Sequence, residues 1–288
     1  MSGLTHGEAI RIAAEKFRDA GLEDPRFEAR QIVLWATGLT SAALISAHDE
    51  PMAFEHQSAW QMAVRHREAR RPFQHLAGWT DFYGLSLKTD PRALIPRADS
   101  ECVVDLALEL LPKDREQQIA DLGTGSGCLL LASLSQRPMA TGFGLDASQE
   151  AVRLARDNAD TVGLGDRTTF ECLSWTEWTG WATCDLIISN PPYIASGIIP
   201  TLDPEVRDHD PVMALDGGED GLSAYREIIA LAGDHMTSGA HIVLEIGYDQ
   251  RETVTKLLET AGFEQIRHQK DLGGNDRAIA ATRPWRPT

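Results

Sequence analysis

Three alternating glycines mark the first segment of this 288-residue chain that could do chemistry. An apolar stretch ends at Asp121, and the turn after it consists of Gly123, Thr124, Gly125, Ser126 and Gly127. Glycines let the backbone turn sharply and approach a ligand closely, and the apolar helix expected at residues 128–134 would add unpaired N–H groups. The G-x-G-x-G spacing differs from the G-x-G-x-x-G that cradles a dinucleotide pyrophosphate. The segment therefore predicts a binding turn for another ligand.

Two acidic residues accompany this turn. Asp121 directly precedes it and could hold the ammonium group of a zwitterionic ligand. Asp146 ends the next expected strand, a position from which an acid can hydrogen-bond ribose hydroxyls, as it does in dinucleotide folds. The placement of Asp146 weakens the alternative that the turn is tight but binds nothing.

A second segment follows a buried-type strand expected at residues 185–189, and it reads Asn190, Pro191, Pro192, Tyr193. Ligands of open α/β sheets bind outside the carboxyl ends of the strands, so the position suits a site. Two consecutive prolines fix two φ angles and remove two N–H donors. The loop should therefore be stiff, with its carbonyls free as acceptors; a rigid turn without a catalytic role is the structural alternative.

The tetrapeptide matches the needs of a planar nitrogen, which is a poor nucleophile because its lone pair is delocalised. The Asn190 side-chain oxygen and the Pro191 carbonyl could accept its two N–H bonds and aim the lone pair at a methyl group. Tyr193 would pack its ring on the planar target. The gain would come from positioning and from electrostatic stabilisation, with no strong base required. We therefore expect an in-line displacement at a sulfonium methyl.

The surrounding elements divide into three parts. Residues 1–72 show only helical patterns, including an N-cap and proline at Asp24 and Pro25 and a stop at Gly38, and we expect a small helical bundle that binds a partner. Residues 73–97 read as a hairpin linker, and residues 98–288 alternate strands with helices, as in a parallel α/β sheet. The expected strands are Gln118–Asp121, Thr141–Asp146, Thr168–Cys172, Asp185–Ser189, His241–Glu245 and Ala278–Ala281.

Composition narrows the class of partner. The net charge is −16, from 43 acidic and 27 basic residues, which counts against nucleic acid as the main partner. No stretch approaches the ~20 apolar residues of a membrane span, and the N-terminus shows no secretory signal. The four cysteines and the histidines show no metal-ligand spacing, so we expect no metal site and free thiols in a reducing cytoplasm.

Taken together, these segments resemble the class I methyltransferases that modify planar nitrogens, and more narrowly the peptide chain release factor glutamine methyltransferases (the PrmC/HemK family). The resemblance covers nearly the whole chain. Beyond the glycine turn and the tetrapeptide, it rests on Arg71–Gly78, Phe82–Gly84, Leu94–Arg97, Glu205, Val206, Ala214–Gly218, Gly221, Leu222, Leu244–Gly247 and Asp271–Arg277.

The resemblance implies a helical N-terminal domain, a hairpin linker and a Rossmann-like catalytic domain. It implies N5-methylation of the glutamine in the Gly-Gly-Gln motif of class I release factors, with S-adenosylmethionine as methyl donor and S-adenosylhomocysteine as product. We expect the enzyme to be a monomer. Residues 123–127, Asp121 and Asp146 would bind the cofactor, Trp175 would pack near the adenine, and Asn190 would touch both cofactor and substrate. Residues 190–193 would hold the glutamine.

The sequence departs from the family pattern at two positions. Ala98 stands where a proline is usual, and Ser174 replaces an aspartate before Trp175, which puts a polar contact to the adenine amine in doubt. Trp175 could instead belong to the core, and Glu245 could border the site or cap a strand. Arginines 65, 67, 70 and 71 read first as a solvated helix end and second as a docking patch. The acidic segment 216–227 imitates a calcium loop, but we interpret it as a tight structural loop.

Two other functions compete with this interpretation. The main alternative is an N6-adenine or N2-guanine methyltransferase acting on DNA or RNA, since the same tetrapeptide could serve an exocyclic amine. Such enzymes usually carry basic grooves or a recognition domain. A non-catalytic protein that keeps the fold as a scaffold is the other, and the intact turn, acid and tetrapeptide argue against it.

Overall fold

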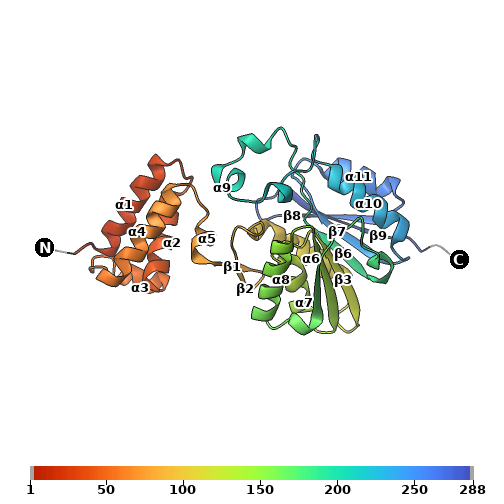
Figure 1. Cartoon of the computed structure of the whole chain (residues 1–288), viewed down its shortest axis with the longest axis horizontal. Coiled ribbons are helices and arrows are strands. Elements are labelled where there is room, and N and C mark those ends of the chain that lie inside the picture. The colour runs from red at the N-terminus through yellow and green to blue at the C-terminus, as the bar shows by residue number, and fades with distance from the viewer. Residues whose placement is uncertain (1–2, 286–288) are drawn as a thin grey trace. The chain divides into compact units, whose positions relative to one another are not determined.

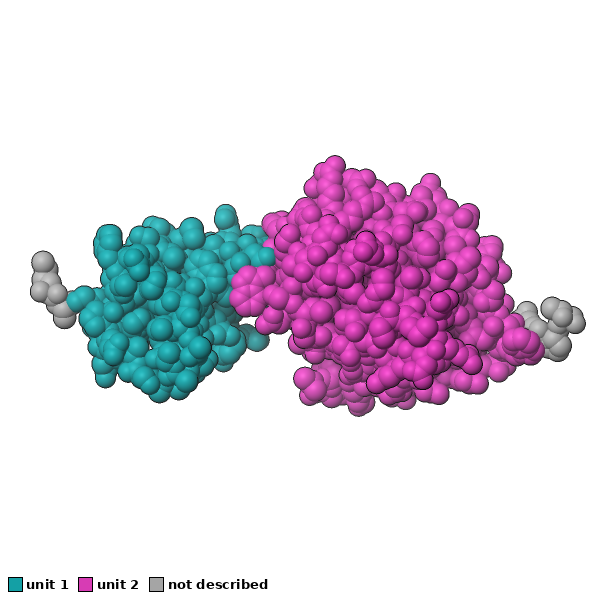
Figure 2. Space-filling view, turned by 90° about the horizontal axis from the view of Figure 1, so that it is seen from below, with its two compact units in different colours: residues 1–78, 203–209 teal, residues 79–202, 210–288 magenta. Residues whose placement is uncertain are grey.

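The structure is a computed structural model that describes residues 3–285. The terminal residues of the predicted first and last domains (1–2 and 286–288) lie outside the described part. The chain divides into two compact units, each described by itself (Figure 2). Unit 1 contains the chain up to Gly78 together with residues 203–209, and unit 2 contains residues 79–202 and the chain from Asp210 onward.

Unit 1 is a helical bundle, as the sequence predicts. Its N-terminal caps follow local rules: Thr5 and Glu8 form a capping box, and Asp24 accepts a hydrogen bond from the Phe27 N–H. The bundle closes over a core that includes Phe17 and Ile32, both fully buried. Its helices are α1 (His6–Asp19), α2 (Pro25–Thr37), α3 (Ser41–Ser46), α4 (Phe54–Glu68), α5 (Phe73–Ala77) and α9 (Pro204–Arg207).

The domain boundaries differ from the predicted ones in two respects. Helix α5 lies inside the span predicted as linker, but it belongs to unit 1, so the first unit ends at Gly78 and not at residue 72. The hairpin itself is shorter than the predicted linker and consists of β1 (Trp79–Phe82) and β2 (Leu85–Lys88). Residues 203–209 join unit 1 although they lie far along the chain, which local patterns do not reveal.

Unit 2 is built on a seven-stranded sheet in the order β5-β4-β3-β6-β7-β9-β8 (Figure 1). Neighbouring strands are parallel from β5 through β7, and β9 is antiparallel to both of its neighbours. The strands are β3 (Gln117–Leu122), β4 (Ala140–Asp146), β5 (Thr168–Cys172), β6 (Leu186–Ser189), β7 (His241–Glu245), β8 (Glu264–Lys270) and β9 (Asp276–Thr282). The predicted architecture, a Rossmann-like α/β domain that follows a helical domain, is confirmed.

Helices cover both faces of this sheet. Successive strand residues point to opposite faces, so Ile119 joins the core beneath α6, α7 and α8, and Ala120 joins the core beneath α10 and α11. These helices are α6 (Glu101–Leu110), α7 (Cys128–Gln136), α8 (Gln149–Thr161), α10 (Ser223–His235) and α11 (Arg251–Thr260). Short 3-10 helices span Ala98–Ser100, Gly165–Arg167, Gly180–Thr183, Ile199–Thr201 and Val212–Ala214. No helix among residues 3–285 is both long and apolar enough to cross a membrane.

Candidate functional site

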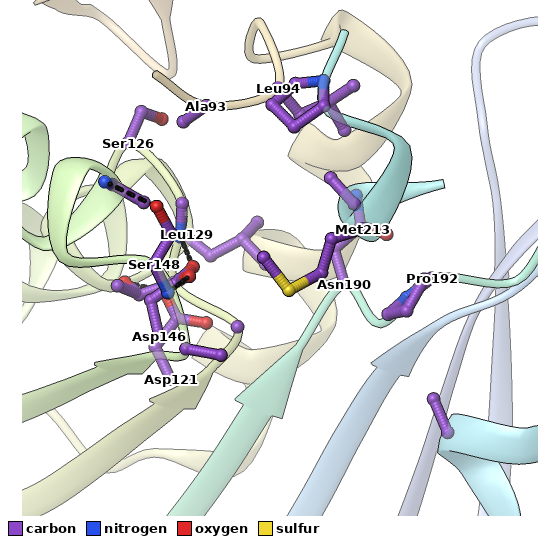
Figure 3. A pocket seen from close by; sticks show the side chains of 18 of the residues that line it. Ala93, Leu94, Asp121, Ser126, Leu129, Asp146, Ser148, Asn190, Pro192 and Met213 are labelled. Atoms are coloured by element: carbon purple, nitrogen blue, oxygen red, sulfur yellow. Dashed lines mark hydrogen bonds between the residues drawn. The ribbon is translucent and has the colours of Figure 1, made fainter. Parts of the chain in front are cut away.

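A pocket of about 610 Å³ lies at the carboxyl ends of β3, β4 and β6. The chain runs from β3 outward through β4 to β5 and then returns to the other side of β3 with β6, so the strand order reverses between β3 and β6. Open α/β sheets bind ligands at such a reversal, where two loops separate. The volume falls in the range of small-ligand pockets. Figure 3 shows Asp121 and Asp146 on one side of this pocket and Asn190 and Pro192 on the other.

The glycine turn forms one wall of the pocket, and all three of its glycines have positive φ, between 55° and 82°. Asp146 holds the turn, because its carboxylate accepts the Gly125 N–H at 2.9 Å and the Ser148 N–H at 2.8 Å. Burial raises the pKa of Asp146. The structure brings this carboxylate to the pocket as the sequence predicts, and a contact to ribose hydroxyls stays a prediction.

Asp121 lies at the base of the pocket with one carboxylate oxygen unsatisfied. Its Oδ2 accepts a hydrogen bond from the Thr124 hydroxyl at 2.7 Å, whereas Oδ1 is buried without a partner in the described chain. Burial raises the pKa of Asp121 to about 7. A buried carboxylate oxygen without a partner is costly, and a cationic ligand group would offset that cost. The residue is therefore suited to an ammonium group.

Trp175 stands against the same wall. A Cβ atom on Gly123 would lie 3.7 Å from its ring, and its indole N–H donates to the Glu227 carboxylate. Both side chains line the pocket, although the ring also packs against the core beneath α10 and α11. The packing against adenine stays a prediction. Ser174, at the position of the family's aspartate, also lines the pocket, and its hydroxyl is hydrogen-bonded within its own loop to Thr176.

The tetrapeptide after β6 divides its residues between two places. Asn190 and Pro192 line the pocket, and the Asn190 side chain makes no hydrogen bond to any residue that the structure describes. Pro191 is buried and is not among the pocket's lining residues. Tyr193 is not among them either, because its hydroxyl turns toward Glu245 at 3.2 Å. Its predicted contact to the target group stays a prediction.

Both the helical part and the α/β part of the chain resemble known proteins. Family models match residues 8–78 (PrmC N-terminal domain) and residues 101–200 (methyltransferase small domain). A release factor glutamine methyltransferase of Caulobacter vibrioides is 38% identical over 276 residues, which cover 96% of each chain. One of Bradyrhizobium diazoefficiens is 39% identical and covers 98% of this chain and 96% of its own. The chain belongs to the release factor glutamine methyltransferase family.

Membership in the release factor glutamine methyltransferase family confirms the resemblance predicted from the motifs. Among solved structures, a methyltransferase from Pyrococcus furiosus matches with a TM-score of 0.52 over 79% of this chain and 100% of its own. At 15% identity that likeness supports the fold alone.

Beneath the tetrapeptide of this family member lies a buried polar network. Glu245 ends β7 and accepts hydrogen bonds from the Ser100 hydroxyl at 2.5 Å and from Tyr193. Arg277 donates to the Tyr193 hydroxyl at 3.4 Å and pairs with Asp271 at 3.0 Å. Burial raises the pKa of Glu245 to about 7. Glu245 therefore fixes the Tyr193 side chain through its hydroxyl. The sequence suggests Glu245 only as a residue that borders the site or caps a strand, and neither role describes this contact.

A glycine-rich loop packs directly on the tetrapeptide backbone. A Cβ on Gly217 would lie 2.8 Å from the Pro192 carbonyl oxygen, and one on Gly221 would lie 2.4 Å from that of Tyr193. The Gln250 side chain donates to the carbonyls of both Tyr193 and Gly221, at 3.0 and 3.2 Å. Sequence analysis missed these contacts, although the run of glycines at 217, 218 and 221 was a visible signal of close backbone approach.

The resemblance of this loop to a calcium site has a structural explanation. Asp216 accepts hydrogen bonds from the Ser196 hydroxyl at 2.6 Å and the Gly218 N–H at 2.9 Å, which shape a turn. Asp220 instead pairs with Arg226. Within residues 3–285, no group of three or more metal-binding side chains is assembled.

Proposed function

We propose that this enzyme transfers a methyl group from S-adenosylmethionine to the side-chain amide nitrogen (N5) of the glutamine in the Gly-Gly-Gln motif of class I peptide chain release factors. The observation that carries the proposal is the position of Asn190. Its hydrogen-bonding side chain has no partner among residues 3–285 and lines the pocket that also contains the unsatisfied Oδ1 of Asp121. One end of the pocket is therefore suited to a zwitterionic donor, and the other to a planar amide.

The residues of the pocket fit the methyl donor. Asp121 would hold its ammonium group, and Asp146 would hold its ribose hydroxyls. The backbone of residues 123–127 would pack against the donor, and Trp175 would pack near its adenine. The unsatisfied Asp121 oxygen supports this fit, since it lacks a donor that the ligand possesses. When bound, the donor supplies an electrophilic methyl group on a sulfonium sulfur.

The chain's own contribution to the reaction is positional. The Asn190 side-chain oxygen and the Pro191 carbonyl would accept the N–H bonds of the target amide, so that its lone pair faces the methyl carbon. Transfer would form the N–C bond as the S–C bond of the donor breaks, and the proton on the nitrogen would pass to water. Pro192 would border the bound glutamine. Tyr193, held by Glu245, would support the amide from its side of the loop.

Transfer of labelled methyl groups to a purified class I release factor tests the proposal. Label should appear on the release factor and vanish when the glutamine of its Gly-Gly-Gln motif is replaced by alanine. Undermethylated tRNA, rRNA and DNA run alongside test the alternative acceptor, an adenine N6 or guanine N2 amine. Label on nucleic acid alone would contradict the proposed substrate while leaving the methyl donor in place.

We further propose that the helical unit contacts the protein substrate and that the enzyme acts as a cytoplasmic monomer. All four cysteines are free thiols, which agrees with a reducing compartment. Light scattering of the purified enzyme would test the oligomeric state. A dimeric mass at assay concentration would contradict it.

A further inference from the structure

One segment of the chain belongs to unit 1, the helical unit, although its neighbours in the sequence on both sides belong to unit 2, the methyltransferase unit. The chain leaves the methyltransferase unit after Leu202, contributes residues 203–209 to the helical unit, and returns at Asp210. The segment includes the short helix α9. Together with the passage at Gly78, the backbone crosses between the units three times.

Glu205 holds this segment in the helical unit through two arginines of the α4 end. Its Oε1 accepts hydrogen bonds from Arg67 and Arg70, both at 2.6 Å, and its Oε2 accepts a second one from Arg70 at 2.7 Å. The side chains of Arg67 and Glu205 are 9% and 16% exposed, so water screens these contacts poorly. Burial alone would raise the pKa of Glu205, but the hydrogen bonds from Arg70 and Arg67 outweigh it and lower the pKa to about 2.

The two arginines are themselves fixed. Besides its single bond to Glu205, Arg67 donates two hydrogen bonds to Glu28 on α2, at 3.1 and 3.0 Å. Arg70 adopts a left-handed backbone with φ of 57° and donates to the carbonyls of Ala20 and Gly21 at 3.1 Å. A non-glycine residue keeps this conformation only where its surroundings fix it. The interpretation of these arginines as a solvated helix end is therefore wrong for Arg67 and Arg70, because their acidic partner lies more than 130 residues away in sequence.

The chain that follows Glu205 becomes the wall of the pocket. Asp210 is buried and pairs with Arg97 at 2.8 Å, and Pro211, Met213 and Ala214 line the pocket. Pro211 is only six positions after Glu205, so the anchored residue and the pocket wall lie within about 20 Å along the chain. Immediately afterwards, the chain reaches the turn at Asp216 that binds Ser196.

We propose that Glu205, held by Arg67 and Arg70, is a positioning residue for the pocket wall of residues 211–214 that follows it in the chain. The segment 197–215 is held at its ends by the contact of Ser196 with Asp216, at Asp210 by the ion pair with Arg97, and in its middle by Glu205. Loss of the Glu205 contacts would leave the Asp210–Arg97 pair as a remaining side-chain anchor on that side of the wall, and the wall would move more beside Asn190. Met213 and Val212, 60% and 56% exposed, present the apolar side chains of this wall. The inference rests on the proposed function only for its kinetic consequence.

The test compares two substitutions within one ionic cluster. Glu205→Gln removes the anchor, and Glu28→Gln removes the other acidic partner of Arg67 but leaves the Arg70–Glu205 contacts in place. Both should lower the melting temperature of the full-length enzyme. Only Glu205→Gln should speed amide hydrogen exchange in residues 206–215, by about tenfold or more, since it alone removes the contacts that close this segment.

The kinetic readout should follow the same division. Glu205→Gln should lower kcat/KM for the release factor by about tenfold or more, and Glu28→Gln by less than about threefold. Binding of S-adenosylhomocysteine should change little in either variant, because β3 and β4 hold Asp121 and Asp146. If Glu205→Gln does not fold, Arg70→Gln removes the same two-oxygen contact from a more exposed side chain and should give the same pattern.

Two results would overturn the inference. Exchange of residues 206–215 at the wild-type rate in Glu205→Gln would show that the anchor does not restrain them. Equal kinetic losses in both variants would reduce the cluster to a general stabiliser of the helical unit. Hydrogen exchange needs no substrate, so failure of the proposed function, seen as inactivity of the wild-type enzyme on release factor, is distinguishable from either result.

Discussion

At the scale of single residues, two buried carboxyl groups near the tetrapeptide have raised pKa values but different surroundings. Burial raises the pKa of both Asp121 and Glu245 to about 7. Glu245 is fully occupied by Ser100 and Tyr193, whereas Asp121 keeps a free oxygen and lines the pocket. In each case the folded protein binds the proton more tightly than the unfolded chain, so the stability contribution is complete below pH 4 and is lost as the pH rises through about 7. Only Asp121 is placed to couple this proton to a ligand.

The affinity for S-adenosylhomocysteine should therefore depend on pH through Asp121. The ammonium group of the ligand is attracted to the charged carboxylate, which predominates above pH 7, so Kd should weaken by up to about tenfold per unit as the pH falls below 7. Titration calorimetry from pH 5.5 to 8.5 measures this slope. Asp121→Asn should bind more weakly throughout and show no such slope, and a pH-independent wild-type Kd would contradict the assignment.

Replacing Asn190 by alanine should abolish methyl transfer without unfolding the protein. The side chain makes no internal hydrogen bond in the described chain, so its removal leaves no buried partner unsatisfied. Losing a group that both orients and stabilises the reacting amide should reduce kcat by about 100-fold or more. Single-turnover label transfer measures the loss, with melting temperature and ligand binding as controls. Near wild-type turnover would exclude the positioning mechanism.

At the scale of elements, the tetrapeptide is held by a loop rather than by its own sequence. The glycine loop of residues 216–221 packs on the Pro192 and Tyr193 backbone, and Gln250 connects the two. Ile194 and Asp216 also form an isolated parallel bridge. The two prolines therefore belong to a larger packed assembly, which joins the carboxyl end of β6 to the glycine loop.

Gly221→Ala should reduce methyl transfer beyond the effect expected from the strain of a left-handed backbone conformation alone. Gly221 has φ of 74°, and a Cβ there would lie 2.4 Å from the Tyr193 oxygen. The matched control is Gly239→Ala, because Gly239 has φ of 86° and no atom within 4 Å of its Cβ position. Both variants should lose about 1–2 kcal/mol of stability from the left-handed conformation. Only Gly221→Ala should also lose most of its methyl transfer, and equal activities would refute the proposed contact.

The elements also show what the sequence could predict. Strand β6 and the tetrapeptide were predictable because a short apolar run, Leu186–Ile188, ended at a distinctive loop. Strand β8 was not predicted, because it lies at the edge of the sheet and its residues Glu264–Lys270 are mostly polar and exposed, without an apolar alternation. Contacts such as Glu245 with Ser100 join residues 145 positions apart, so no local pattern contains them.

At the scale of the whole molecule, charge should govern the encounter with the protein substrate. The chain carries a net charge of −16, and such a field attracts partners with basic surfaces from a distance. Raising the ionic strength from about 0.1 M to 1 M shortens the Debye length from ~10 to ~3 Å. We expect the KM for release factor to rise several-fold with kcat nearly unchanged. A KM that stays constant or falls with salt would argue that apolar contacts dominate the encounter.

The contribution of residues 203–209 to the helical unit bears on how such enzymes can be recombined. A chimera that exchanges the N-terminal part of this chain at Gly78 for that of a relative would separate Arg67 and Arg70 from Glu205. The transplanted bundle would have to pair with Glu205 of this chain, and a relative's bundle that lacks matching arginines would leave this mostly buried carboxylate without partners. The unit that can be exchanged is therefore discontinuous in sequence. An exchange that keeps the enzyme intact must transfer residues 203–209 together with the N-terminal helical bundle.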